Sequence, residues 1–244
     1  MLKIITGFKQ KTSGLVMSKS IFIKKMFNDI SPWYDTLNDV LSLSTHRWWK
    51  RAFVQKVMSR PHQRILDCAT GTGDIAFLME KNTEASITAI DFSEKMIEYA
   101  QGRAKKNKSN VLFSVEDISR LTFAEKSFDA VTVSFGIRNV EEVEKGLKEL
   151  SRVSRNIYIL EFGQPKNWLI SKMYFASLKL YFPLFSLFSG RSDAYEYLIQ
   201  SSQTFPSGED FINLLKKNTG FQHFKYTPLF FGVVYIYQAS NEAI

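Results

Sequence analysis

Four polar residues each stand at the end of an apolar run, where a buried strand would finish: Asp67, Asp91, Asp117 and Ser134. A carboxylate in that position can accept hydrogen bonds from both hydroxyls of a ribose, as we expect for Asp91, or from an adenine amino group, as we expect for Asp117. Parallel strands end at one edge of their sheet, where such sheets bind ligands. The pattern predicts a site for a nucleoside cofactor, although Asp91 alone fits equally well as the acid of a helix N-terminus.

A glycine-rich turn follows the first of these runs, within RILDCATGTGD at residues 64–74. Gly71 and Gly73 allow the backbone to pass close to a ligand. The spacing Gly71-x-Gly73-x-x-Ala76 also satisfies the dinucleotide fingerprint, so NAD is the second candidate cofactor. Asp67 stands four residues before Gly71, and this D-x-A-x-G-x-G pattern resembles motif I of class I S-adenosylmethionine methyltransferases. S-adenosylmethionine is therefore the first candidate.

Strand-like and helix-like segments alternate through the middle of the chain. Short apolar runs predict buried strands, and apolar residues three and four apart predict helices. The expected strands are around Ile65 and Leu66, then Ala85–Ile90, Val111–Val115, Ser127–Ser134 and Asn156–Phe162; the expected helices are Asp74–Met79, Glu94–Lys106 with Ser93 as its cap, and Glu141–Val153. Four consecutive strand-helix units predict an α/β fold with a doubly wound, mostly parallel sheet.

The C-terminal part predicts one more helix and two more strands. The pattern Ser207-Gly208-Glu209-Asp210 indicates a helix start for Phe211–Asn218, with Ser207 in the capping position. Phe221–Thr227 and Gly232–Ala239 predict closing strands joined by Pro228–Phe231. These two strands are expected to form an antiparallel hairpin at the edge of the sheet.

Composition favours one globular domain in a reducing compartment. The 244 residues are 45% hydrophobic and 23% charged, which suits a large α/β domain. Cys68 is the only cysteine and the three histidines lack ligand-like spacing, so neither disulfides nor a metal site is expected. The N-terminus lacks the pattern of a signal peptide, which favours the cytoplasm. The net charge of +8 suits nucleic acid, an anionic membrane or simply a lysine-rich surface.

Five stretches together resemble the quinone-biosynthesis C-methyltransferases, which methylate demethylmenaquinone or the 2-polyprenyl-6-methoxy-quinol precursor of ubiquinone. They are Met26-Phe27-x-x-Ile30-Ser31-x-x-Tyr34-Asp35-x-x-Asn38, Leu66-Asp67-x-Ala69-x-Gly71-Thr72-Gly73-Asp74, Phe128-Asp129-Ala130-Val131 through Ser134-Phe135-Gly136-Ile137-Arg138-Asn139, Leu160-Glu161-Phe162, and Tyr195-x-Tyr197-Leu198-x-x-Ser201. Motif I belongs to the whole superfamily, whereas SFGIRN is distinctive to this family. The chain departs from the family before the fifth strand, where Arg152-Val153-Ser154-Arg155 replaces a longer loop.

The resemblance implies a Rossmann-like class I methyltransferase fold with a seven-stranded sheet, mostly parallel, whose last strand is antiparallel. In a single domain over residues 1–244, it implies a flexible segment 1–20, a helical cap 21–60, a cofactor-binding core 61–163, an apolar lid insertion 164–205, and a closing helix and hairpin 206–244. It assigns Thr72, Asp91, Asp117, Ile118 and Ser134 to the cofactor, beside the motif I residues Asp67, Gly71 and Gly73. It places Arg138, Asn139 and Tyr34 at the quinol.

The implied reaction is transfer of a methyl group to a quinol ring carbon in menaquinone or ubiquinone biosynthesis, with demethylmenaquinol first. Arg138 stays protonated and is expected to stabilise the developing phenolate, while the base is a water held by Asn139, Tyr34 or a carboxylate. On sequence alone Tyr34 and its polar neighbours fit a turn equally well. An RNA methyltransferase and a non-catalytic S-adenosylmethionine-binding protein are the alternatives; SFGIRN in place of an Asn/Asp-Pro-Pro turn, and Cys68 lying inside motif I, disfavour RNA.

The most apolar stretch is Trp168–Phe188, inside the expected insertion. Lys172, Lys179 and Pro183 argue against a membrane span, because each central charge costs about 2.5 to 3.5 kcal/mol on insertion. We expect a helical lid that accepts the polyprenyl tail and attaches reversibly to the inner face of the cytoplasmic membrane. No nucleic-acid partner is expected, and a homodimer is left open.

Overall fold

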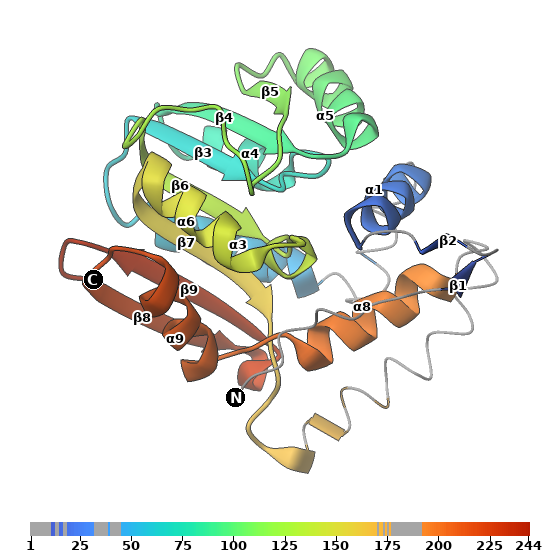
Figure 1. Cartoon of the computed structure of the whole chain (residues 1–244). Coiled ribbons are helices and arrows are strands. Elements are labelled where there is room, and N and C mark those ends of the chain that lie inside the picture. The colour runs from blue at the N-terminus through green and yellow to red at the C-terminus, as the bar shows by residue number, and fades with distance from the viewer. Residues whose placement is uncertain are drawn as a thin grey trace.

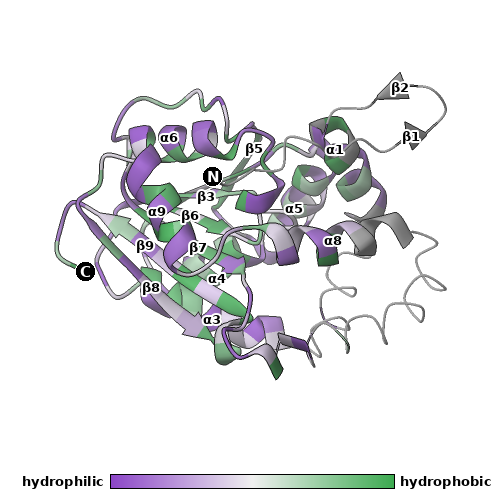
Figure 2. Ribbon diagram, turned by 60° about the horizontal axis from the view of Figure 1, so that its bottom comes forward, coloured by the Kyte–Doolittle hydropathy of each residue, from purple (hydrophilic) through white to green (hydrophobic). Residues whose placement is uncertain are grey.

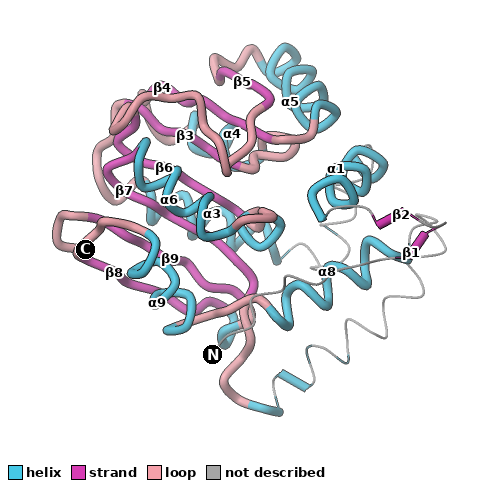
Figure 3. The backbone as a smooth tube through the Cα atoms, in the orientation of Figure 1, coloured by secondary structure: helices cyan, strands magenta, loops and turns pink. Residues whose placement is uncertain are grey.

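A seven-stranded sheet with helices on both faces forms the centre of the molecule (Figures 1 and 3). The computed structural model describes residues 11–12, 15–16, 19–31, 39, 45–169, 171–172, 174, 176 and 192–244. In spatial order the strands are β5 (Leu112–Val115), β4 (Ser86–Asp91), β3 (Arg64–Cys68), β6 (Phe128–Ser134), β7 (Ser154–Phe162), β9 (Val234–Ser240) and β8 (His223–Leu229). In this sheet β9 runs antiparallel to both of its neighbours, β7 and β8, and the other pairs are parallel, so the expected seven-stranded α/β sheet with an antiparallel last strand is confirmed.

The helices lie close to their expected positions. The described helices are α1 (Lys19–Ile30), α3 (Thr45–Val57), α4 (Asp74–Glu80), α5 (Glu94–Asn107), α6 (Val143–Val153), α8 (Ser192–Thr204) and α9 (Glu209–Asn218), with short 3-10 turns η2 (Ile137–Asn139) and η3 (Phe230–Gly232). A separate two-stranded hairpin joins β1 (Lys11–Thr12) and β2 (Leu15–Val16). None of the described helices is long and apolar enough to cross a membrane.

The two faces of the sheet have separate hydrophobic cores. Ile65 packs with α3 and α4 on one face, whereas the next residue, Leu66, packs with α6 and α9 on the other. Side chains alternate across a strand, so a strand that is covered on both faces needs apolar residues at successive positions. Figure 2 shows this as hydrophobic central strands beneath helices with hydrophilic outer sides. The two-faced core explains the unbroken apolar runs of the sequence.

The starts of α5 and α9 test the two N-caps that the sequence predicts. The Ser93 hydroxyl accepts a hydrogen bond from the Met96 N–H at 3.2 Å, so the expected cap of α5 is confirmed. The expected cap of α9 is wrong, because Gly208 is the N-cap and no side chain caps it. Ser207 instead donates to Oε1 of Gln164 at 2.9 Å, which ties the start of α9 to the segment that follows β7.

The short connection before β7 is a direct passage from helix to strand. Helix α6 ends at Val153 and β7 begins at Ser154, with no intervening loop. The Lys126 ammonium donates to the carbonyls of Ser151 and Ser154, both at 2.7 Å, and the Ser154 hydroxyl donates to the carbonyl of Leu150. These bonds satisfy carbonyls that a longer connection would leave to water or to a cap.

The glycine-rich turn after β3 lies against the turn after β6. Ala69, Gly71 and Gly73 all have positive φ angles, which fold the chain back over the ends of the strands. A Cβ atom added to Gly136 would overlap the Cβ of Ala69. The pairing of β3 with β6 therefore requires glycine at position 136, because no side chain fits between the two turns.

We expect Gly136→Ala to lower the free energy of unfolding by about 1 to 3 kcal/mol, since the added methyl group must push the two turns apart. Gly102→Ala is the matched control, because a Cβ at Gly102 in α5 would meet nothing within 4 Å. The control should gain up to about 1 kcal/mol from helix propensity. Urea unfolding followed by circular dichroism measures both, and equal changes in the two variants would contradict the proposed steric contact.

Candidate functional site

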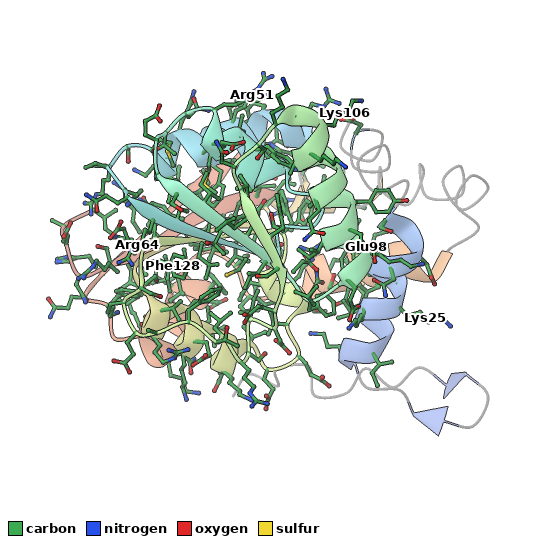
Figure 4. All side chains as sticks on the ribbon, turned by 90° about the horizontal axis from the view of Figure 1, so that it is seen from above. Lys25, Arg51, Arg64, Glu98, Lys106 and Phe128 are labelled. Atoms are coloured by element: carbon green, nitrogen blue, oxygen red, sulfur yellow. The ribbon has the colours of Figure 1, made fainter. Side chains whose placement is uncertain are left out.

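A cavity of about 430 Å³ opens at the carboxyl ends of β3, β4 and β6. Arg64 and Phe128, which begin β3 and β6, lie at the opposite side of the molecule from α1, which carries Lys25 (Figure 4). Six residues predicted from the sequence line the cavity: Gly71, Asp91, Asp117, Ile118, Ser134 and Asn139. The volume is in the range of small-molecule and cofactor sites.

Asp91 joins the glycine-rich turn to the start of α5. Its carboxylate accepts hydrogen bonds from the N–H of Gly71 at 2.9 Å and of Ser93 at 3.0 Å. Burial raises the pKa of Asp91 to about 6, although these backbone donors act in the opposite direction. The acid is thus buried at the wall of the cavity with capacity for further donors, as a ribose site requires.

Asp67 lies beneath the turn and does not line the cavity. Thr70 and Thr132 each donate a hydroxyl hydrogen bond of 2.6 Å to its carboxylate, one to each oxygen. Burial raises the pKa of Asp67 to about 6. Because Thr70 is in the turn and Thr132 is in β6, Asp67 fixes the turn to the sheet. Its predicted place at the cofactor stays a prediction.

Thr72 and Gly73 are buried in the same turn and do not line the cavity, so their predicted contact with the cofactor stays a prediction. Arg103 of α5 donates to the carbonyl and to the hydroxyl of Thr72, at 2.9 and 3.0 Å. Arg103 and Lys50 also pair with Asp74, at 2.7 and 2.8 Å. Although burial opposes it, these two cations lower the pKa of Asp74 to about 2. Neither cation was predicted, since only the fold brings α3, α5 and the turn together.

Helix α1 closes one side of the cavity. Phe27 of α1 lines the cavity together with Phe92 and with Met96 of α5, so the lining between these two helices is apolar. Polar contacts hold α1 there: Lys24 pairs with Glu94 at 2.6 Å, the Ser93 hydroxyl bonds to Asn28 at 2.6 Å, and Lys19 donates to the carbonyls of Arg138 and Val140. Only tertiary packing identifies these residues.

One buried hydroxyl stands at the end of β6, in a residue that lines the cavity. Within the described residues, the buried Ser134 Oγ has no hydrogen-bond partner, and Ser134 lines the cavity. A buried hydroxyl without a partner is costly. A polar ligand atom in this cavity would satisfy it, as would be expected of a nucleoside cofactor.

Arg138 forms a buried ion pair with Glu161 of β7. Its Nη1 lies 2.6 Å from Oε1 of Glu161 and also donates to the carbonyl of Phe135 at 2.7 Å. Burial raises the pKa of Glu161, although Arg138 acts against that rise. Arg138 is not among the lining residues, and its charge is balanced by Glu161. Its predicted direct contact with the quinol stays a prediction.

Asn139 lines the cavity and is held by a tyrosine of α8. The Tyr197 hydroxyl donates to Oδ1 of Asn139 at 3.1 Å, and the Asn139 amide nitrogen donates to the carbonyl of Phe135 at 3.4 Å. Burial raises the pKa of Tyr197 to about 12, so the hydroxyl remains a donor. Tyr197 belongs to one of the five stretches that carry the family resemblance, but it was not predicted as a site residue. Tyr34 lies outside the described residues.

The described residues contain no group of three His, Cys, Asp or Glu side chains placed to hold a metal ion. The lining of the cavity is instead rich in carboxylates, with Asp91, Glu116, Asp117 and Glu141 among its members. Such a lining suits a ligand with a positive charge and several hydrogen-bond donors, such as a sulfonium nucleoside.

The chain matches one protein family over almost its whole length. A model described as the ubiE/COQ5 methyltransferase family matches residues 15–241. The ubiquinone/menaquinone biosynthesis C-methyltransferase UbiE of Bdellovibrio bacteriovorus is 36% identical over 223 residues, which are 89% of this chain and 95% of that protein. A demethylmenaquinone methyltransferase of Bacteroides fragilis is 36% identical over 91% of this chain and 94% of its own length.

Solved methyltransferases share the fold at low sequence identity. A methyltransferase from Thermotoga maritima gives a TM-score of 0.62 at 18% identity, over 89% of this chain and 99% of that one. Phosphoethanolamine N-methyltransferase 2 from Haemonchus contortus, solved with S-adenosyl-L-methionine, gives 0.56 at 20% identity, over 75% of this chain and 39% of that one. The class I methyltransferase fold expected from the sequence is thereby confirmed.

We expect Asp91→Asn to weaken binding of S-adenosylmethionine by roughly tenfold to a hundredfold, because charge-assisted hydrogen bonds contribute about 1.5 to 3 kcal/mol. Asp129→Asn is the matched control: Asp129 also accepts two backbone N–H bonds, from Gln63 and Arg64, but at the amino ends of the strands. The control should change stability and leave affinity intact. Titration calorimetry on folded proteins measures both, and unchanged affinity in Asp91→Asn would refute the assignment.

The affinity should also depend on pH. Because the pKa of Asp91 is raised to about 6, its carboxyl is protonated below that pH and accepts fewer hydrogen bonds. Hydroxyl donors favour the ionised form, so affinity should rise as pH rises through about 6 and binding should release protons there. Calorimetry in buffers of different ionisation enthalpy measures the release. Asp91→Asn should reduce it, and an unchanged release would assign it to another group.

Proposed function

The chain belongs to the ubiE/COQ5 methyltransferase family, and from that premise we propose which residues perform its reaction and on which acceptor. The protein is an S-adenosylmethionine-dependent methyltransferase that methylates a ring carbon of a quinol in quinone biosynthesis. Menaquinone is common to the names of the Bdellovibrio and Bacteroides relatives, so we propose demethylmenaquinol as the first acceptor and the ubiquinone precursor as the second.

The observation that supports this function most directly is the cavity at the sheet edge, with a buried ribose-type acid on one side and the SFGIRN turn on the other. Asp91 and the N–H groups of the glycine-rich turn would hold the ribose side of the cofactor. Asp117 and Ile118 would hold its base, and Ser134 would donate to or accept from a polar atom. When bound, S-adenosylmethionine supplies an electrophilic methyl group on a sulfonium.

On the acceptor side, Asn139 would donate an N–H to the oxygen of the quinol. Its Oδ1 accepts from Tyr197 and one N–H donates to the Phe135 carbonyl, so the amide is oriented and its second N–H would serve the quinol. A donor at that oxygen stabilises the phenolate, which raises electron density on the neighbouring ring carbon. The carbon can then attack the methyl group in line. Tyr197 therefore acts as a positioning residue for Asn139.

The Arg138–Glu161 pair would keep the turn that carries Asn139 in place. Glu161 accepts from the backbone N–H of Arg138 at 3.4 Å as well as from its guanidinium, so β7 holds η2 at two points. Removing one member of a buried pair leaves the other uncompensated, at a cost of about 3 to 5 kcal/mol.

Protons leaving the quinol would pass through water to a carboxylate at the rim, such as Glu141, which lines the cavity.

The lipid solubility of the proposed acceptor also indicates where the enzyme works. A polyprenylated quinol resides in a bilayer, so we propose that the enzyme works at the inner face of the cytoplasmic membrane as a peripheral protein. Most of Trp168–Phe188, the expected lid, lies outside the described residues. An RNA substrate is disfavoured because carboxylates outnumber cations in the cavity lining, and a phosphate backbone binds best to cations.

We expect the protein to transfer label from methyl-labelled S-adenosylmethionine to reduced short-tailed demethylmenaquinone and not to total RNA. The reduced state matters, because only the quinol supplies an ionisable hydroxyl beside the reacting carbon. Scintillation counting of the organic and nucleic-acid fractions decides between the acceptors. Labelled RNA with unlabelled quinol would overturn the proposed function.

We expect Tyr197→Phe to lower kcat about tenfold, because loss of one positioning hydrogen bond costs about 1.4 kcal/mol of transition-state stabilisation. Cofactor affinity should not change. Without the oriented donor, the phenolate forms less readily, so the acidic limb of the kcat profile should shift to higher pH. Tyr158→Phe is the matched control, since that buried tyrosine of β7 bonds to Gln238 of the neighbouring strand β9 and does not line the cavity. A lower kcat without a shift of the pH profile would indicate a merely structural role.

A further inference from the structure

Four large apolar side chains are exposed at one end of the molecule. Trp168 and Leu169, after β7, are 71% and 50% exposed, and Phe230 and Phe231, in the η3 turn between β8 and β9, are 51% and 73% exposed. We call these four residues the aromatic end. Exposed aromatic clusters on soluble proteins mark surfaces for partners or membranes.

The two segments that carry the aromatic end lie side by side. The N–H of Gly163 donates to the carbonyl of Val233 at 2.9 Å. The Cα of Pro165 lies within 3.5 Å of the position that a Cβ on Gly232 would occupy. These contacts place the chain before Trp168 against the chain after Phe231, so their exposed side chains belong to one surface.

The backbone of the turn disfavours the residues found there. Phe230 has φ 45° and Phe231 has φ 58°, both in the left-handed region, where glycine and asparagine are preferred over bulky residues. Phe230 has a packing contact, since its ring centroid lies 6.2 Å from that of Trp49. Phe231, more exposed still, has a ring contact with Phe230, at 5.9 Å between centroids, and that partner is itself half exposed. Two aromatics kept in a strained, exposed turn indicate a function outside the folded core.

Lysines accompany Trp168 and Leu169 in the chain. The segment from Phe162 to Ser192, which carries these two residues, contains Lys166, Lys172, Lys179 and Arg191 and no acidic residue. Lys166 and Lys172 are exposed, and the Lys172 ammonium lies 6.0 Å from the Trp168 ring centroid. This charge distribution complements anionic lipid headgroups.

Buried rings connect the aromatic end to the cavity. Phe230 contacts Trp49, and Trp49 lies 6.4 Å by ring centroids from Phe135, which lines the cavity. Phe162 packs between them, 4.5 Å from Phe135 and 6.4 Å from Trp49. A continuous row of packed aromatic side chains thus links the exposed turn to the SFGIRN turn.

We propose that the aromatic end inserts into the interfacial layer of an anionic bilayer, with Trp168 and Phe231 as its principal anchors. Aromatic side chains favour this layer, and lysines beside them meet the headgroups. The inference rests on the proposed quinol methyltransferase function, because a polyprenylated acceptor gives the surface its purpose. It assigns the membrane contact to defined residues rather than to the basic charge of the whole chain.

The test is sedimentation of the full-length protein with vesicles of phosphatidylcholine and phosphatidylglycerol in equal parts, without substrate. Phe231→Asn and Trp168→Ser should each weaken binding about tenfold, and the double variant more. Asparagine suits the left-handed backbone, so Phe231→Asn should be at least as stable as the parent protein. Tyr99→Asn is the matched control, because Tyr99 is an exposed aromatic of α5, at the other end of the sheet (Figure 1).

The outcomes distinguish a failure of the proposed membrane contact from a failure of the proposed methyltransferase function. The proposal predicts that all variants keep the parent turnover on a water-soluble short-tailed quinol, and that the two anchor variants lose turnover only on a long-tailed quinol in vesicles. Vesicle binding by the double variant that equals the parent's would overturn it. The proposal would also be overturned if the parent protein did not bind vesicles and the substitutions converted a dimer to a monomer, as measured by analytical ultracentrifugation. Failure of the parent on soluble quinol would instead refute the proposed function.

Discussion

The parallel pairing of β3 with both β4 and β6 is the constraint on which the site depends. Cys68 stands opposite Ile90 on one side and Val133 on the other, so three chain turns leave the sheet at the same level. The glycine-rich turn then reaches Asp91 by a backbone hydrogen bond and contacts the β6 turn through Ala69. A slip in either register would separate these groups and remove the cavity.

Buried acids in this protein are stabilised in two different ways, and the difference fits their roles. Glu161 is paired with the guanidinium of Arg138, so its charge is matched and its contribution is to hold a turn. Asp67 and Asp91 instead accept hydrogen bonds from hydroxyl and backbone groups, and burial raises the pKa of each to about 6 although these donors act against the rise. A carboxyl without a countercharge can gain more from a bound donor than one that is already paired.

The two substrates of the proposed reaction come from different media, and we propose a separate surface for each. The cofactor cavity is lined by carboxylates and lies under α1, which polar contacts hold to α5 and to η2. The aromatic end is apolar and flanked by lysines. Trp49 of α3 lies between them, with ring contacts to both Phe135 and Phe230. A water-soluble cofactor and a lipid-borne acceptor could thus meet at the SFGIRN turn.

The sequence by itself determined the class of fold and the cofactor side of the site, because both are written in local patterns. Apolar runs of strand length predicted the sheet, and acids at their ends predicted Asp91 and Asp117 at the cavity. Only the tertiary structure decided which of the predicted residues line the cavity. Asp67 and Arg138, which the sequence analysis placed at the cofactor and at the quinol, do not line the cavity and meet Thr132 and Glu161, partners 65 and 23 positions away. Tyr197 and the aromatic end depend on contacts between distant segments, and no local pattern specifies such contacts.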